Sequence, residues 1–344
     1  MSAKFIIVSM CLVVAVIFFL AVTDQQILSD GRDFYQHEHV HEPSNVRNIK
    51  NNHTPRPKKV MKERNHSGQL GNAISHAETS CMDGTFMPRG SQPYVLLLSA
   101  PGSGNTWLRY LIESLTGVYT GSMYRDTRLL NGGFLGESEP PRSGRVIVVK
   151  THSTDMHEKA DGVLLLIRDP YSALTADFKR IAAGGNHTGI ISSNIFNSEH
   201  WSMYARWAAR RWQQTIQKGL EMSAAKRLVV YYEDLLEDLP EELRRVAHFL
   251  NATLREERLQ CTMLHREGNF HRQPYSMPFD SFKENVVILA VDSAIRNARK
   301  TMERYGGPKM RSYERNLQMV SDKIMKLYVN DTINECTFCN RLVH

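Results

Sequence analysis

Cysteine is scarce in this chain, and its glycine-rich stretch lacks the lysine that a nucleoside triphosphate site would need. There are five cysteines in 344 residues, and the pair Cys336-x-x-Cys339 has no second closely spaced pair to complete a zinc site. The glycine-rich stretch 101–105 contains no lysine, whereas the phosphate-binding loop of nucleoside triphosphatases has one directly after its last glycine. The sequence therefore disfavours both a zinc site and a kinase or nucleoside triphosphatase.

The overall composition is that of a folded protein. Hydrophobic residues make up 42% of the chain, which is enough for a full core in one or two domains. The formal net charge of +7 favours anionic partners.

The N-terminal region contains an unbroken apolar run over residues 5–22, with Lys4 directly before it. A run of this length is just enough to span a bilayer as a helix. Lys4 predicts that residues 1–4 stay in the cytosol and that the rest of the chain enters the lumen. A cleaved signal peptide is the alternative. Residues 23–90 show little apolar periodicity, so we expect a flexible luminal stem there.

Glycosylation acceptors and cysteines agree with a luminal location. Asn-x-Ser/Thr acceptors begin at Asn52, Asn65, Asn186, Asn251 and Asn330. Outside the predicted anchor, which contains Cys11, an even number of cysteines remains: Cys81, Cys261, Cys336 and Cys339. Disulfides are expected in an oxidising compartment, and all three pairings of these four stay open.

The stretch Tyr94–Glu113 predicts an anion-binding turn. An apolar run over 94–98 is suited to a buried strand, and the apolar spacing from Thr106 onward is helical. Between them, a glycine-rich turn would direct backbone N–H groups and the positive helix end at a bound anion. An ordinary strand-to-helix turn is the alternative.

The following sequence alternates apolar runs with helical patterns. Strands are predicted at 146–149, 162–167 and 227–231, and helices at 171–182, 201–220 and 240–250. This order predicts an α/β fold of the P-loop-like type, with three α/β/α layers around a central parallel sheet. We place this domain at residues 91–305 and a helical extension at 306–344. The gap between residues 119 and 145 predicts a long irregular excursion, which is often functional.

Polar side chains follow each predicted strand. They are the turn at 101–105, then Lys150 and His152, then Arg168, and finally Tyr232. Ligands of such sheets bind beyond the carboxyl ends of the strands, so we expect these groups to share one crevice.

Four motifs in this order resemble the sulfotransferases that use 3′-phosphoadenylyl sulfate (PAPS). They are Pro-Gly-Ser-Gly-Asn-Thr-Trp107, Val-Val-Lys-Thr-His152, Leu-Ile-Arg-Asp-Pro170 and Val-Tyr-Tyr-Glu-Asp-Leu235. Among relatives, the chain is most similar to the sulfotransferase domain of WSC-domain-containing proteins, Golgi enzymes implicated in sulfating sialic acid. The WSC modules themselves are missing, because four luminal cysteines are too few for them.

The resemblance implies a role for each matching residue. His152 matches the catalytic base, with Lys150 beside it, and Arg168 matches the arginine that binds the 3′-phosphate. Trp107 and Tyr232 match the aromatic residues on either side of the adenine. The loop that binds the 5′-phosphosulfate corresponds to Gly102, Ser103, Gly104, Asn105 and Thr106.

Two positions depart from the family pattern. Gly102 stands where the family has lysine or arginine, so Lys150, Arg109 or a more distant group would have to act on the leaving phosphate. Ala176 stands where the family has a phosphate-binding serine, for which Thr175 or Ser172 would substitute. Arg272 lies in a segment that resembles a late cofactor-binding segment, and it is a further phosphate candidate.

The resulting prediction is a Golgi sulfotransferase, anchored as a single-pass type II membrane protein with a luminal catalytic domain. It would use PAPS as donor, a glycan or glycoprotein as acceptor, and neither a metal nor a nucleic-acid partner. Sialic acid is one possible acceptor, and basic residues in the 119–145 excursion would suit its charge. An inactive relative that binds PAP or glycans is the alternative. The sequence does not predict an oligomeric state.

Overall fold

The computed structural model describes residues 83–153, 159–184, 192–268 and 280–315. The predicted anchor at 5–22 and most of the predicted stem at 23–90 lie outside these ranges. None of the helices in the described ranges is both long and apolar enough to cross a membrane.

The core of the described domain is a parallel sheet, as predicted from the sequence. Five strands pair in the order β2-β3-β1-β4-β5, and every pair is parallel. The strands are β1 (Val95–Ser99), β2 (Gly121–Ser122), β3 (Val149–Thr151), β4 (Ala160–Ile167) and β5 (Ala224–Tyr231). Their carboxyl ends therefore meet at one edge of the sheet.

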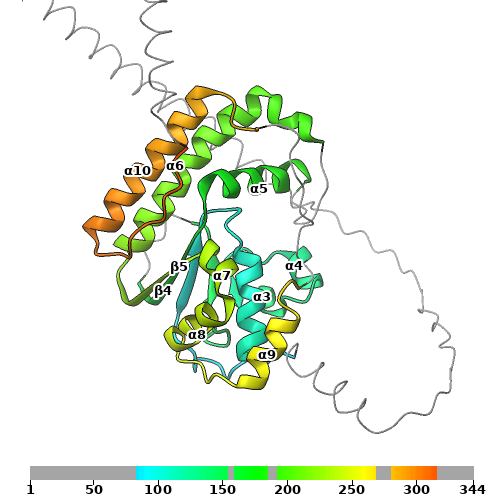
Figure 1. The fold of residues 1–344 in the computed structure, drawn as a ribbon. Coiled ribbons are helices and arrows are strands. Elements are labelled where there is room, and N and C mark those ends of the chain that lie inside the picture. Colours follow the sequence, from blue (N-terminus) through cyan, green and yellow to red (C-terminus); the bar gives the residue numbers. More distant parts are fainter. Residues whose placement is uncertain (1–82, 154–158, 185–191, 269–279, 316–344) are drawn as a thin grey trace, which may run out of the picture. The chain divides into compact units, whose positions relative to one another are not determined.

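Helices cover both faces of this sheet, and Figure 1 shows the two groups. All of β1 is buried, with Leu96 and Leu98 in one hydrophobic cluster and Val95 and Leu97 in another. The first cluster includes residues of α5 (Pro170–Ala182), α6 (Glu199–Glu221) and α10 (Asn285–Arg304). The second includes residues of α3 (Asn105–Thr116), α8 (Leu239–Phe249) and α9 (Glu256–Leu264). Because successive side chains of a strand point to opposite faces, β1 supplies the core on both sides.

Helix α6 confirms the aromatic stripe predicted between residues 201 and 220. Trp201, Tyr204, Trp212 and Ile216 are all buried in the core. Helix α6 packs chiefly against α10, and the two helices lie side by side in Figure 1. The stripe therefore serves packing and not ligand binding.

Some elements differ from the sequence prediction. The strand predicted at 146–149 begins only at Val149, so Lys150 lies within β3 and not after it. The excursion from 119 to 145 contains β2, the short helix α4 (Thr127–Asn131) and the 3-10 turn η1 (Leu135–Ser138). The short helix α7 (Tyr232–Glu237) follows β5 directly. These short elements lie below the length that a hydrophobic period can reveal.

Both predicted flanking segments are partly described. Thr85 forms a parallel bridge with Val118, and the backbone N–H of Met87 donates to the carbonyl of Arg145. Part of the predicted stem therefore packs against the sheet domain. Residues 306–315 of the predicted extension form no helix, and the rest of that extension lies outside the described residues.

The predicted luminal markers are only partly visible. Asn251 is exposed in a turn with a positive φ of 53° directly after α8. Cys261 lies in α9. The other acceptors and cysteines lie outside the described residues: Asn52, Asn65, Asn186, Asn330, Cys11, Cys81, Cys336 and Cys339. Glycosylation and the disulfide pairing stay predictions.

Candidate active site

The glycine-rich loop joins β1 to α3 at the carboxyl edge of the sheet. Gly102 and Gly104 have positive φ angles of 77° and 92°, which favour glycine. Among the described residues, no side chain caps the N-terminus of α3, and its first turn holds no acidic residue. By contrast, α5 begins at the same edge with Asp169 as its cap. The start of α3 therefore offers uncapped N–H groups to an anion.

Two buried polar atoms in this loop lack partners among the described residues. Ser103 is only 1% exposed, and its Oγ has no hydrogen-bond partner there. Asn105 donates from Nδ2 to Ser99 Oγ at 3.0 Å, whereas its Oδ1 has no partner. A buried hydroxyl without a partner costs free energy that a bound oxygen acceptor would recover. The Ser103 hydroxyl therefore fits a phosphate or sulfate group in the loop.

Helix α5 excludes any side chain at position 102. A Cβ atom there would lie 2.0 Å from the carbonyl oxygen of Ala173 and 3.0 Å from the backbone nitrogen of Asp177. Real Cβ contacts with backbone are never this short, so the lysine or arginine of the family pattern does not fit this loop. The Gly102 carbonyl instead accepts a hydrogen bond from Arg168 Nη1 at 3.0 Å.

Arg168, Tyr232 and Trp107 lie together beside the loop. The Arg168 guanidinium lies 4.2 Å from the centre of the Tyr232 ring, and that ring packs directly on Gly104. Trp107 meets Tyr232 edge to face, with ring centres 5.4 Å apart. The structure thus brings together the predicted phosphate and adenine residues. The two rings contact each other, so an adenine would have to separate them to lie between them.

His152 is oriented by the backbone at the end of β1. Its Nδ1 lies 2.8 Å from the carbonyl oxygen of Ser99. A carbonyl only accepts hydrogen bonds, so Nδ1 carries the proton in the neutral ring and Nε2 carries the lone pair. The ring is therefore held in the tautomer that a general base needs at Nε2.

Lys150 lies two residues before His152 and is only 6% exposed. Burial, followed by repulsion from Arg109, lowers the pKa of Lys150 from 10.5 to about 8, although Glu137 and Asp126 act in the opposite direction. Its ammonium lies 5.6 Å from the centre of the Tyr124 ring. Lys150 is therefore a cation whose charge can change near neutral pH.

Tyr124, at the start of the excursion, belongs to this site although sequence reasoning missed it. Its hydroxyl accepts a hydrogen bond from the backbone N–H of His152 at 2.7 Å. Its ring stacks on the imidazole, with centres 5.7 Å apart and planes 26° apart. Nothing in the sequence pairs an excursion residue with a strand end, so only the fold reveals this contact.

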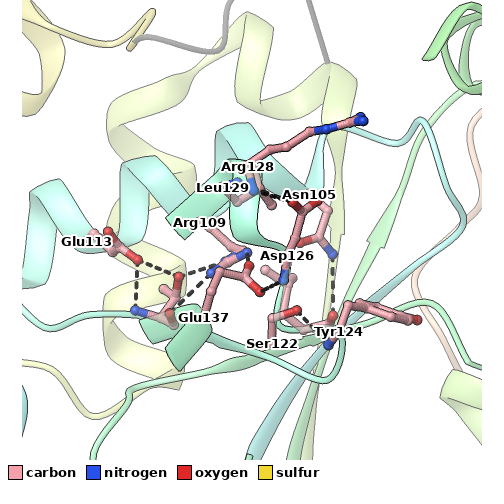
Figure 2. Close-up of polar contacts among 11 residues, drawn as sticks. Asn105, Arg109, Glu113, Ser122, Tyr124, Asp126, Arg128, Leu129 and Glu137 are labelled. Atoms are coloured by element: carbon pink, nitrogen blue, oxygen red, sulfur yellow. Dashed lines mark hydrogen bonds and ion pairs between the residues drawn. The ribbon is translucent and has the colours of Figure 1, made fainter. Parts of the chain in front are cut away.

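Arg109 does not take over the role of the missing loop lysine. The side chains of Arg109 and Glu137 are both fully buried and form an ion pair at 2.5 Å. Arg109 also donates from Nε to Thr120 Oγ1 at 2.8 Å, and Figure 2 shows this network between α3 and the excursion. Arg109 is therefore a structural residue, and of the two residues named as substitutes for the loop lysine only Lys150 remains a candidate.

The predicted substitutes for the phosphate-binding serine are occupied with local contacts. Thr175 Oγ1 donates to the carbonyl of Tyr171 at 2.8 Å, and Ser172 Oγ donates to Asp169 Oδ2 at 2.7 Å. Neither hydroxyl donates toward the loop as it stands. Arg272 lies outside the described residues, so its predicted role is not examined by the structure.

A cavity of about 620 Å³ adjoins Arg168 and Tyr232. Its walls come from the start of α5, from α7 and from the segment after α10, and they contain Tyr171, Ser172, Arg311, Ser312, Tyr313 and Arg315. The walls also carry the carboxylates of Asp169 and Glu233, and Arg311 and Arg315 form ion pairs with nearby carboxylates. Arg168 is therefore the arginine of this cavity that we assign to a phosphate group. No cluster of three or more metal-ligating side chains occurs among the described residues.

Comparisons with known proteins agree with the predicted family. Residues 160–256 match the family model described as "Sulfotransferase family". A WSCD family member of Aedes aegypti is 34% identical over 205 residues, which cover 58% of this chain and 63% of the relative. One of Drosophila melanogaster is 37% identical over 203 residues, which cover 55% and 60%. The chain thus spans about three fifths of the length of the curated relatives it matches.

Solved structures show only a distant likeness. A sulfotransferase domain from the curacin biosynthetic pathway is 15% identical with a TM-score of 0.35, and the match covers 64% of this chain and 99% of that one. Retinol dehydratase in complex with retinol and PAP is 17% identical with a TM-score of 0.29, with coverages of 64% and 84%. Scores this low support no transfer of ligands or residue roles to this chain.

Proposed function

This chain carries a sulfotransferase-family domain, and we propose that it transfers the sulfuryl group from PAPS to a hydroxyl of a glycan. One observation carries the proposal. The uncapped loop, with the buried Ser103 hydroxyl that lacks a described partner, lies next to an imidazole whose lone pair is on Nε2. An anion cradle beside an oriented base suits transfer of an anionic group to a hydroxyl.

The residues present fit PAPS as the donor. The N–H groups at the start of α3 and the Ser103 hydroxyl would hold the 5′-phosphosulfate. Arg168 would bind the 3′-phosphate, because its planar guanidinium suits two phosphate oxygens. Trp107 and Tyr232 would contact the adenine, and the adjoining cavity offers the volume for a nucleotide. PAPS supplies the sulfuryl group that the acceptor oxygen attacks as the bond to the 5′-phosphate breaks.

The chain's own groups would assist this transfer in three ways. His152 Nε2 accepts the proton of the acceptor hydroxyl, while the Ser99 carbonyl keeps the ring in its tautomer. Lys150, when protonated, stabilises the negative charge on the sulfuryl oxygens and on the leaving phosphate. The loop N–H groups add fixed partial charges that need no reorganisation.

The remaining parts of the proposal concern acceptor and location. The acceptor we propose is a glycan of a glycoprotein, with sialic acid as the candidate sugar, because the resemblance to WSC-domain-containing sulfotransferases implies it and a basic chain suits an anionic sugar. The site would face the Golgi lumen, with residues 5–22 as a type II membrane anchor. An inactive relative that binds PAP without transfer is the rival function, and Gly102 is the residue that favours it.

A transfer assay distinguishes these two functions. The full chain is incubated with labelled PAPS and with either an intact or a desialylated glycoprotein. We expect label on the intact glycoprotein and much less on the desialylated one. Binding of PAP without transfer to any glycan on an array would contradict the enzymatic proposal, and equal labelling of both glycoproteins would contradict sialic acid as acceptor.

Replacing Arg168 by alanine is expected to weaken PAP binding by about 1.5–3 kcal/mol, the value of a hydrogen bond to a charged group. Isothermal titration calorimetry measures this loss. Arg142→Ala is the control, because Arg142 instead lies 4.1 Å from the centre of the Tyr94 ring, just before β1. Equal PAP affinities in both variants and the parent chain would remove Arg168 from the binding site.

The rate of transfer is expected to fall as the pH rises through about 8, because Lys150 loses its proton there. The same shift acts on stability in the opposite direction. The folded pKa lies below the ordinary 10.5, so between these values the unfolded chain binds more protons and stability rises with pH. Initial rates from pH 6 to 10 at saturating PAPS test this. Lys150→Arg should remove the fall near pH 8, and a parent chain with an unchanged rate up to pH 10 would contradict the role of Lys150.

A further inference from the structure

We infer that Tyr124 is a positioning residue of this site, which holds His152 in place and shields Lys150 from water. The inference rests on the proposed function and extends it to a residue outside the family motifs. Tyr124 is an exposed residue, with 38% of its surface accessible to solvent. Few large apolar or aromatic side chains of the described residues are this exposed, and an exposed tyrosine with several directed contacts needs an explanation beyond packing.

The first set of contacts fixes His152. The Tyr124 hydroxyl accepts from the His152 backbone N–H at 2.7 Å, and its ring stacks on the imidazole. The Ser99 carbonyl holds the ring on another side through Nδ1. His152 directly follows Thr151, the last residue of β3. Tyr124 therefore contacts both the backbone and the ring of the first residue after this strand.

The second set of contacts concerns the charge of Lys150. The Tyr124 ring lies over its ammonium at 5.6 Å, which both attracts the cation and limits its hydration. The other charged groups that act on Lys150 are Arg109 on α3, Arg180 on α5, Glu137 in η1 and Asp126 before α4. Arg211 on α6 acts on Tyr124 itself. Removing the ring would open the ammonium to water while leaving these charges in place.

Hydrogen bonds before and after Arg125 in the sequence hold this segment in place, and Figure 2 shows the residues that form them. On one side, the Tyr124 N–H donates to Ser122 Oγ at 3.1 Å. On the other side, the Asp126 N–H donates to Glu137 Oε2 at 2.9 Å, and Glu137 is paired with the buried Arg109. The intervening Arg125 has a positive φ of 52°, a conformation that residues other than glycine rarely adopt. The network therefore maintains a strained turn at Arg125 that directs Tyr124 toward His152 and Lys150.

Two substitutions separate the effects of the ring and of the hydroxyl. Tyr124→Leu removes both, and Tyr124→Phe removes only the hydroxyl. Tyr305→Leu is the matched control, because Tyr305 is also an exposed tyrosine, at 42%, but lies at the end of α10 and contacts Glu221. Each variant is compared with the parent chain for kcat, KM for PAPS, PAP affinity and the pH profile of the rate.

We expect Tyr124→Leu to lower kcat by about 10- to 100-fold, because even a small displacement of the His152 imidazole from its reactive position slows the transfer by this order. KM for PAPS and PAP affinity should stay within about twofold, because Tyr124 does not contact the anion loop. The alkaline limb of the profile should move to higher pH, since the Lys150 ammonium becomes hydrated. Tyr124→Phe should keep that limb and lose less kcat. A parent-like kcat and pH profile in Tyr124→Leu would overturn the inference while the proposed function stands.

A second measurement does not depend on transfer. The imidazole Cε1–H signal of His152 is identified by NMR through its absence in His152→Gln. Removal of a stacked aromatic ring changes this signal's chemical shift and its pH titration. We expect Tyr124→Leu to change both, and Tyr305→Leu to change neither. An unchanged signal in Tyr124→Leu would overturn the positioning role. This result does not depend on transfer activity, so a parent chain that transfers no sulfuryl group would contradict the proposed function separately.

Discussion

His152→Ala is expected to reduce sulfuryl transfer by about 10²- to 10⁴-fold, the usual contribution of a positioned general base. The reduction arises because the acceptor hydroxyl then has no group to receive its proton. PAP affinity should stay within about twofold, since the loop and Arg168 lie on other elements and keep their contacts. Labelled PAPS measures the transfer, and calorimetry measures the PAP affinity.

Ser99→Ala is a close control for this change. The contact that orients His152 comes from the backbone carbonyl of Ser99 at 2.8 Å, whereas the Ser99 hydroxyl lies 3.4 Å from Nδ1. Alanine keeps this carbonyl but removes the hydroxyl that accepts from Asn105 Nδ2. Because Asn105 Nδ2 also has the Leu97 carbonyl as an acceptor at 3.4 Å, Ser99→Ala should retain most of the activity. Full turnover by His152→Ala, or equal losses in both variants, would remove His152 from the chemistry.

Glu137→Ala is expected to destabilise the fold by about 3–5 kcal/mol, the cost of leaving one member of a buried ion pair without its partner. Arg109 would remain fully buried, with its hydrogen bonds to the Thr120 hydroxyl and carbonyl and with the charge of Glu113 nearby. The Asp126 N–H would also lose its acceptor, so the excursion would loosen beside Lys150. Chemical denaturation followed by circular dichroism measures the free energy of unfolding.

Glu139→Ala provides the matched control two residues away. Glu139 pairs with Arg145 at 2.7 Å, but Arg145 is 35% exposed, so water can replace the partner. We expect this variant to lose no more than about 1 kcal/mol. A double replacement of Arg109 and Glu137 by methionine and leucine should recover most of the stability lost in Glu137→Ala. Similar losses for Glu137→Ala and Glu139→Ala would contradict the buried-pair argument.

The fold could be predicted from the sequence because its central strands are buried on both faces. The runs that became β1 and β4 consist almost wholly of apolar residues, and the helices after them have clear periods. In a parallel sheet the carboxyl ends of the strands meet at one edge. This rule was enough to predict that the loop, Lys150, His152, Arg168 and Tyr232 lie together. By contrast, β3 begins three residues later than its apolar run, because strand bounds are set by pairing with β1 and β2 and not by the apolar run itself.

Two features of the site depend on contacts that a sequence does not display. Tyr124 reaches His152 from an excursion whose path is set by a buried ion pair, and no local pattern reports such a path. Gly102 lies against the backbone of Ala173, which is 71 residues later in the chain. Because every residue type has these backbone atoms, the residue types themselves do not reveal the contact. Sequence reasoning identified Gly102 as unusual, but the physical cause lies in α5.

The close approach of α5 to Gly102 also limits which residue types the loop can accept. A substitution at position 102 would place a Cβ atom on the Ala173 carbonyl, so it fits only if the helix moves as well. The loop residue and the seating of α5 must therefore change together. Gly102→Lys alone would therefore displace α5 and would not simply add a basic group to the intact loop.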